Sequence, residues 1–153
     1  EEQPVPSPLL LRKVEEYLQG RCSNVVVSAK SLQVMGPAYI KVSVTVDIYP
    51  TSIDLSSVAE KNAVDALKAF LHPLTGGADG TGWEFGRMVC FSDLYALLED
   101  IEEIDHVENV SMTLEGDGQK MTFSSENPVE ISIPPYALIY SGEHELTPKL
   151  LME

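Results

Sequence analysis

The sequence contains little cysteine, and this scarcity excludes two ways of stabilising a small domain. Cys22 and Cys90 lie far apart in the sequence, and neither belongs to a Cys-x-x-Cys pair. They support neither a disulfide framework nor a zinc site, so we expect two reduced thiols, which favour folding in the cytoplasm. A chain of 153 residues buries enough surface to fold without such links.

Basic residues and long apolar runs are also scarce. Ten lysines and arginines stand against 24 aspartates and glutamates, giving a formal net charge of -14. A surface this acidic repels phosphates, so nucleic-acid partners are disfavoured. The apolar run Leu9–Leu11 ends at Arg12 and Lys13, far short of the ~20 residues that cross a bilayer, which excludes membrane insertion.

The motifs of common active sites are missing as well. The sequence has no Gly-Lys-Ser/Thr phosphate loop and no Gly-x-Ser-x-Gly nucleophile motif, and its three histidines are scattered. We therefore expect no catalytic residue, cofactor or metal. One alternative stays open, a small acidic hydrolase or divalent-metal-binding domain built from Asp79, Asp105, His106 and His144. A second is a carbohydrate-binding module that uses Trp83 and tyrosines for stacking.

Helical patterns occur in three places. Ser7 followed by Pro8 predicts the start of a helix over about 8–20. A second helix is expected to begin at Asp54 or Ser57, with Glu60 completing a capping box, and to end near residue 71 because Pro73 follows. Ser92 is the expected cap of a third helix, whose leucines recur at helical spacing.

Strand patterns fill most of the remaining sequence. Strict alternation over Ile40–Ile48 predicts a strand with one buried and one solvated face. Further strands are expected at 24–29, 88–91, 110–114, 121–123, 129–133 and 137–140. A turn at Gly116-Asp117-Gly118 is expected to join the strands at 110–114 and 121–123. Together these patterns predict an α+β fold, with about three helices packed on a mostly antiparallel or mixed β-sheet.

Glycines are concentrated between the second helix and Trp83. Gly76, Gly77, Gly80 and Gly82 surround Asp79, and we interpret this stretch as a shaped loop in which glycine supplies positive φ angles. Trp83 and Phe85 are expected to fasten the end of the loop to the core. Gly86 and Arg87 complete this motif. Arg87 is either a charge-paired anchor beneath the loop or an ordinary exposed arginine.

The run His72–Arg87, closed by Ser92-Asp93-Leu94-Tyr95, resembles the baseplate J-like family of phage and phage-derived tails. In that family a helix ending in Phe-Leu-x-Pro-Leu precedes a glycine loop, a Trp-x-Phe-Gly-Arg segment and a Ser-Asp-Leu/Ile-Tyr helix start. The stretches Phe70–Pro73, Pro134–Leu138 and Ser141–His144 also resemble it. Ala78 and Glu84 depart from the family pattern, since they stand where prolines are expected.

This resemblance runs from about Leu9 to Leu146 and implies the C-terminal part of a non-enzymatic baseplate wedge protein. Its implied partners are other wedge proteins and further copies of the chain in a ring, with assembly in the cytoplasm and a final place in a tail baseplate. The particle can be a virus, a prophage remnant or a cellular injection device. The start at Glu1 suggests an excised piece. We expect a proline-rich linker at 1–8, one domain at 9–147 and a tail at 148–153.

Overall fold

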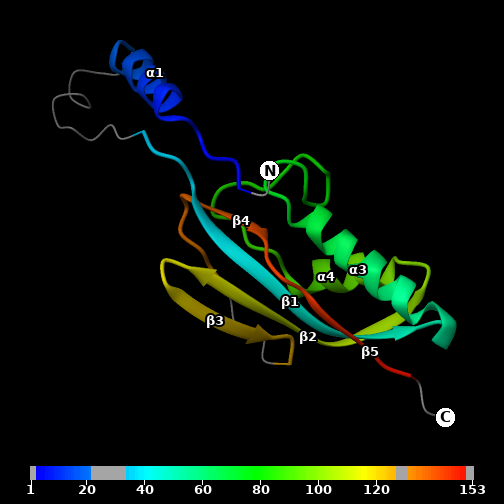
Figure 1. The fold of residues 1–153 in the computed structure, drawn as a ribbon. Coiled ribbons are helices and arrows are strands. Elements are labelled where there is room, and N and C mark those ends of the chain that lie inside the picture. The colour runs from blue at the N-terminus through cyan, green and yellow to red at the C-terminus, as the bar shows by residue number, and fades with distance from the viewer. Residues whose placement is uncertain (1–2, 22–33, 127–130, 151–153) are drawn as a thin grey trace. The chain divides into compact units, whose positions relative to one another are not determined.

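The computed structural model describes residues 3–21, 34–126 and 131–150 (Figure 1). The chain divides into two compact units, Gln3–Ala38 and Tyr39–Glu153. Within the described residues, three α-helices and a five-stranded mixed sheet confirm the predicted α+β class. None of the helices in the described ranges is long and apolar enough to cross a membrane.

The first unit contains helix α1, Pro8–Gln19, as predicted. Ser7 is its N-cap, because the Ser7 hydroxyl oxygen accepts a hydrogen bond from the Leu10 amide at 3.2 Å. Pro8 occupies the first helical position, where its missing N–H costs nothing. No residue of α1 is buried, and Leu10 and Tyr17 are at least half exposed. The start of this helix is therefore set by local sequence, not by packing.

The second unit is built around strand β1, Ala38–Pro50. Val42, Val44, Val46 and Ile48 are fully buried on one face, as the alternation predicts. Strand β2, Ile104–Gly116, pairs antiparallel with β1, and β3, Gln119–Ser124, pairs antiparallel with β2. Strands β4, Ala137–Ser141, and β5, Glu145–Pro148, lie on the other side of β1. Since β5 runs parallel to β1, the sheet is mixed.

Helices α3, Ser56–Phe70, and α4, Phe91–Glu99, pack on the apolar face of this sheet. In Figure 1 both helices lie along one side of the strands. The buried alanines and leucines of the two helices join the β1 valines in one core: Ala59, Ala63, Leu67, Leu94 and Leu98. The opposite face of the sheet, here called the polar face, carries Ser43, Thr45 and Asp47 of β1 and is not covered by these helices.

The starts of α3 and α4 differ from the sequence prediction. The N-cap of α3 is Leu55, which follows a short 3-10 helix, η1 (Ile53–Leu55), so Asp54 and Ser57 do not cap α3. The N-cap of α4 is the exposed Cys90 and not Ser92. Its thiol accepts from the Asp93 amide, while the Asp93 carboxylate accepts from the Cys90 N–H at 3.3 Å. This reciprocal cap places the start of α4 two residues earlier than a cap at Ser92 would.

Several strand predictions also need correction. Residues 88–90 form no strand, because the chain there leads directly into the cap of α4. Residues 131–133 form no strand either, whereas the expected strand at 24–29 and residues 129–130 lie outside the described residues. Strand β5 was not predicted, since its four residues Glu145–Pro148 are too few for a pattern to stand out and include a proline. The other strands are present, and β2 begins earlier than expected, at Ile104.

Candidate functional site

The glycine bend, residues 76–87, folds back onto the end of α3. The Phe70 carbonyl oxygen accepts two hydrogen bonds there, from the Gly77 amide and from the Trp83 indole Nε1–H, each 2.8 Å long. The Trp83 amide donates to the Pro73 carbonyl at 2.9 Å, and the Gly82 amide donates to the Gly76 carbonyl at 2.9 Å. Carbonyl groups at the C-terminus of a helix lack partners within the helix. The bend supplies those partners from within the chain.

Two glycines show why this bend requires glycine. A Cβ atom at Gly76 would overlap the Phe70 carbonyl oxygen and lie 2.5 Å from that of His72. Gly82 has a φ of +99°, and its Cβ would lie 2.7 Å from the Pro73 carbonyl oxygen. Positive φ values also occur at Gly77, Gly80 and Gly86. The predicted role of the glycines is confirmed, except that Gly76 is needed for close approach to the helix and not for a positive φ.

The aromatic residues of the bend behave differently from each other. Trp83 is half-buried and packs against the core, with its ring edge-on to Phe70 at a centroid distance of 5.4 Å. Phe85 is 59% exposed, so the prediction that it fastens the loop is wrong. The Gly86 amide donates to the Ala137 carbonyl at 2.9 Å. This bond anchors the backbone beside β4, and the Phe85 side chain is left in solvent.

The charged residues of the bend do not form a recognition site for an anion. Arg87 is exposed, and its side chain makes no ion pair or hydrogen bond within the described part of the chain, so it is not the charge-paired anchor. A depression of about 200 Å³ beside the bend is lined by Asp79, Glu84 and Asp93 together with Arg87. This volume lies below the ~300–1,000 Å³ that is usual for ligand pockets. Three carboxylates against one guanidinium disfavour phosphate there.

His144 is held inside the second unit between β1 and the end of β4. Its Nδ1 accepts a hydrogen bond from the Val44 amide at 3.1 Å, and its Nε2 lies 2.7 Å from the Ser141 hydroxyl oxygen. An Nδ1 that accepts carries no proton, so Nε2 carries it and donates to Ser141. A general base would have to accept the serine proton at that nitrogen. This serine–histidine pair is therefore arranged for structure, not for nucleophilic attack.

Burial and the nearby Lys68 ammonium lower the pKa of His144 from 6.5 to about 4. The folded chain thus keeps His144 neutral, whereas the unfolded chain binds a proton below pH 6.5. We predict that His144 contributes stability in full above pH 6.5, and that this contribution falls by about 3 kcal/mol as the pH drops to about 4.

The His144 prediction is measured as the difference in urea-unfolding free energy between the parent chain and His144→Asn at several pH values. Asn retains an acceptor near the Val44 amide but does not titrate. Equal pH dependence in the two proteins would show that His144 is not the group responsible.

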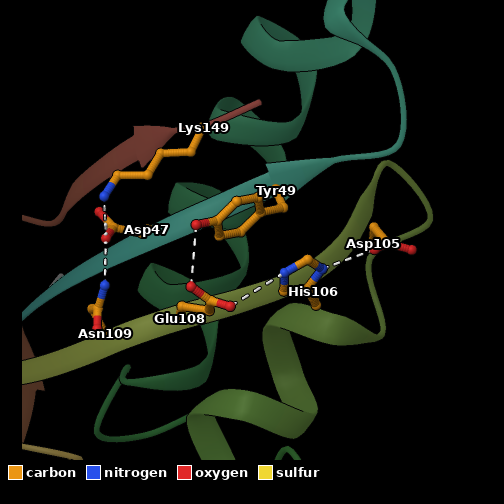
Figure 2. A network of polar contacts seen from close by, with 7 residues as sticks. All are labelled: Asp47, Tyr49, Asp105, His106, Glu108, Asn109 and Lys149. Atoms are coloured by element: carbon orange, nitrogen blue, oxygen red, sulfur yellow. Dashed lines mark hydrogen bonds and ion pairs between the residues drawn. The ribbon is translucent and has the colours of Figure 1, made fainter. Parts of the chain in front are cut away.

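A second polar cluster lies on the polar face, around β1 and β2 (Figure 2). The Tyr49 ring stacks on the His106 ring at 4.3 Å, and the Tyr49 hydroxyl donates to Glu108 at 3.1 Å, which raises the pKa of Tyr49. His106 Nδ1 lies 2.8 Å from an Asp105 carboxylate oxygen. His106 Nε2 lies 3.6 Å from a Glu108 carboxylate oxygen, so each ring nitrogen of His106 faces a carboxylate.

The same cluster fixes an irregularity in the β1–β2 pairing. Asn109 has a φ of +52° and lies where two residues of β2 face one residue of β1. Its amide donates to an Asp47 carboxylate oxygen at 2.8 Å, and Lys149 Nζ lies 2.8 Å from the same oxygen. The Asn109 hydrogen bond and then Lys149 lower the pKa of Asp47. No sequence pattern pointed to this trio, because its members come from three strands or strand ends.

Of the residues of the alternative metal site, only Asp105 and His106 lie together. His144 contacts the Val44 amide, whereas His106 lies opposite Tyr49. Val44 and Tyr49 are five residues apart on β1, which separates the two histidines by roughly 16 Å along the strand. Asp79 lies in the glycine bend. Within residues 3–21, 34–126 and 131–150, no group of three or more histidine, cysteine, aspartate or glutamate side chains is placed to hold a metal ion.

Comparison of the sequence with the models of known protein families finds no match, and comparison with curated proteins finds none either.

Proposed function

We propose that this chain is a structural assembly module of a contractile-tail baseplate wedge, in a virus or a phage-derived injection particle. One observation carries the proposal: the hydrogen bonds of the glycine bend, the most distinctive part of the sequence, close within the chain. The Phe70 carbonyl oxygen accepts hydrogen bonds from both the Gly77 amide and the Trp83 indole N–H. A motif whose backbone and indole hydrogen-bonding groups are paired within the chain in this way has a structural role.

The resemblance of His72–Arg87 to the baseplate J-like family supports the same proposal and gives its biological setting. The partners would be neighbouring wedge proteins and further copies of this chain. The proposal includes no catalytic step, cofactor or metal. The occupied Trp83 Nε1–H and the half-buried Trp83 ring argue against a carbohydrate-stacking platform.

Phe85 and Tyr136 are exposed aromatic residues of the motif region and are available to contact a partner. They are 59% and 56% exposed. The segments that carry them are joined where Gly86 approaches Pro135, since a Cβ on Gly86 would lie 3.0 Å from the Pro135 Cα. Two large aromatic side chains on adjoining segments are typical of the central residues of protein interfaces.

Co-expression with the proteins encoded beside its gene tests this function. We expect a complex that survives gel filtration with at least one neighbour, of the sheath, tube, spike or wedge kind. Phe85→Ser should weaken that complex by ~10-fold or more, whereas Ile53→Ser, at a site 64% exposed on η1, should leave it unchanged. The absence of any complex, together with a calcium- or zinc-dependent thermal shift that a chelator abolishes, would favour the metal-binding alternative.

A further inference from the structure

Within the described part of the chain, β3 forms an outer edge of the sheet. In the strand order β3-β2-β1-β4, β3 stands at one end, and no other strand of the described residues pairs with its outer side. Its pairing with β2 is continuous from Gly116↔Gln119 to Ser111↔Ser124, without a bulge. The strand contains no proline and only one charged residue, Lys120. Proteins usually protect sheet edges with very short strands, prolines, bulges or charged side chains, especially lysine, and of these side chains β3 has only Lys120.

The apolar side of β3 is also incompletely covered. Met121 and Phe123 face the same side as Leu114 and Met112, their partners on β2. Met112 is fully buried, whereas Met121 is 56% exposed. The apolar face of the sheet thus continues beyond the region that the helices cover, up to an edge where no strand of residues 34–126 or 131–150 pairs with the outer side of β3. A further strand added there would cover both features.

The hairpin between β2 and β3 determines which backbone groups of β3 point outward. Asp117 and Gly118 both have positive φ values, +51° and +75°, as in a two-residue type I′ turn. In such a turn Gly116 and Gln119 form a hydrogen-bonded pair, and the pairs then alternate along the ladder. Met121 and Phe123 therefore bond to β2 through their backbone. The amide and carbonyl groups of Lys120, Thr122 and Ser124 point away from β2.

We infer that β3 pairs antiparallel with β3 of a second copy, around a two-fold axis at Thr122. This register places Thr122 opposite Thr122 and Lys120 opposite Ser124, each pair exchanging two hydrogen bonds, about six bonds in all. Met121 then lies opposite Phe123 of the second copy on the apolar face. The strand is therefore self-complementary in hydrogen bonding and in polarity. It is also self-complementary in charge, because no like charges face each other.

A second copy fits this edge better than an unrelated strand does. The single lysine of β3 lies opposite Glu115 within its own sheet and opposite an uncharged serine in the pair. Registers centred on Met121 or Phe123 would form fewer hydrogen bonds between the outward-pointing backbone groups of the two copies. The register centred on Met121 would also place the polar Gln119 opposite Phe123. Two five-stranded sheets would join into one continuous sheet. The inference deepens the proposed function by naming one surface for self-assembly, but it rests on strand geometry alone.

The net charge makes a specific salt dependence part of the inference. Each copy carries a formal charge of -14, so two copies repel each other at long range. Raising the ionic strength from ~0.01 M to ~0.1 M shortens the screening length from about 30 Å to about 10 Å. Association through an uncharged strand edge should therefore strengthen with salt, whereas association through ion pairs would weaken.

Sedimentation of the full chain over a range of concentrations tests the inference. We expect a reversible dimer whose dissociation constant falls as salt is raised. Thr122→Lys places two ammonium groups opposite each other and should weaken the dimer by ~10-fold or more. Thr45→Lys adds the same charge at an exposed position on the polar face, away from the edge, and should not. A monomer under all conditions, or equal effects of the two substitutions, would overturn the inference.

Cross-linking tests the register itself. In a chain with Cys22→Ser and Cys90→Ser, Thr122→Cys should form a disulfide between copies under mild oxidation, because hydrogen-bonded antiparallel partners have Cα atoms about 5.5 Å apart. Thr45→Cys should form none, and a cross-link of equal yield there would overturn the proposed register. If the chain stays monomeric yet binds a baseplate neighbour, only the edge inference fails; if it dimerises but binds no neighbour, the proposed function fails.

Discussion

Replacing Trp83 by alanine is expected to lower the free energy of unfolding by about 3 kcal/mol. The indole packs edge-on against Phe70 at 5.4 Å, and its Nε1–H donates to the Phe70 carbonyl at 2.8 Å. Alanine would remove both the ring packing and the indole hydrogen bond. Among the described contacts, the Phe70 carbonyl oxygen would then accept only from the Gly77 amide. Truncated core aromatics lose ~3–5 kcal/mol, and the half-burial of Trp83 puts the loss at the lower end.

Urea unfolding measures this loss, and Trp83→Phe separates its two causes. Phenylalanine keeps an aromatic ring against Phe70 but has no donor, so it should cost about 1 kcal/mol for the missing hydrogen bond. A loss below about 1 kcal/mol for Trp83→Ala would mean that the indole does not hold the bend to α3.

Gly76→Ala is expected to cost about 3 kcal/mol or more, since the new Cβ would overlap the Phe70 carbonyl oxygen and crowd that of His72. These oxygens cannot shift freely. The Phe70 oxygen accepts from two donors, and the His72 oxygen accepts from the Gly76 amide itself at 2.8 Å. The end of α3 and the bend would have to separate to admit the methyl group.

Gly80→Ala is the matched control for Gly76→Ala. Gly80 has a φ of +67°, and its Cβ would meet nothing closer than 3.9 Å. Alanine there should cost only the left-handed backbone penalty of about 1 kcal/mol. Urea unfolding of both variants provides the comparison. A loss for Gly76→Ala no larger than that for Gly80→Ala would show that close packing against α3 does not explain the need for glycine at position 76.

The fold was predictable where a local pattern coincides with burial. The alternation over Ile40–Ile48 marks β1 because each second residue enters the core, and Ser7-Pro8 marks the start of α1 through its cap. The start of α3 was missed because a 3-10 turn takes the place of a side-chain cap. Cys90 was overlooked as a cap since thiols rarely serve as one.

The candidate site was predictable only in part. The density of glycine indicated the bend, but the direction of Phe85 depends on the contact between Gly86 and Ala137, residues 51 positions apart in the sequence. The roles of His144 and Asn109 depend on partners in other strands, Val44 and Asp47. Single-sequence patterns describe neighbours along a helix or strand and carry no record of such long-range pairs.

The central claim is that the glycine bend is preformed architecture and not a ligand site. Hydrogen–deuterium exchange of the chain alone, without metal, ligand or partner, tests it most directly. The account predicts slow exchange at the amides of Gly76, Gly77, Gly82, Trp83 and Gly86, all of which donate to backbone carbonyls. Exchange at unfolded rates, slowed only when calcium, zinc or a small ligand is added, would contradict it.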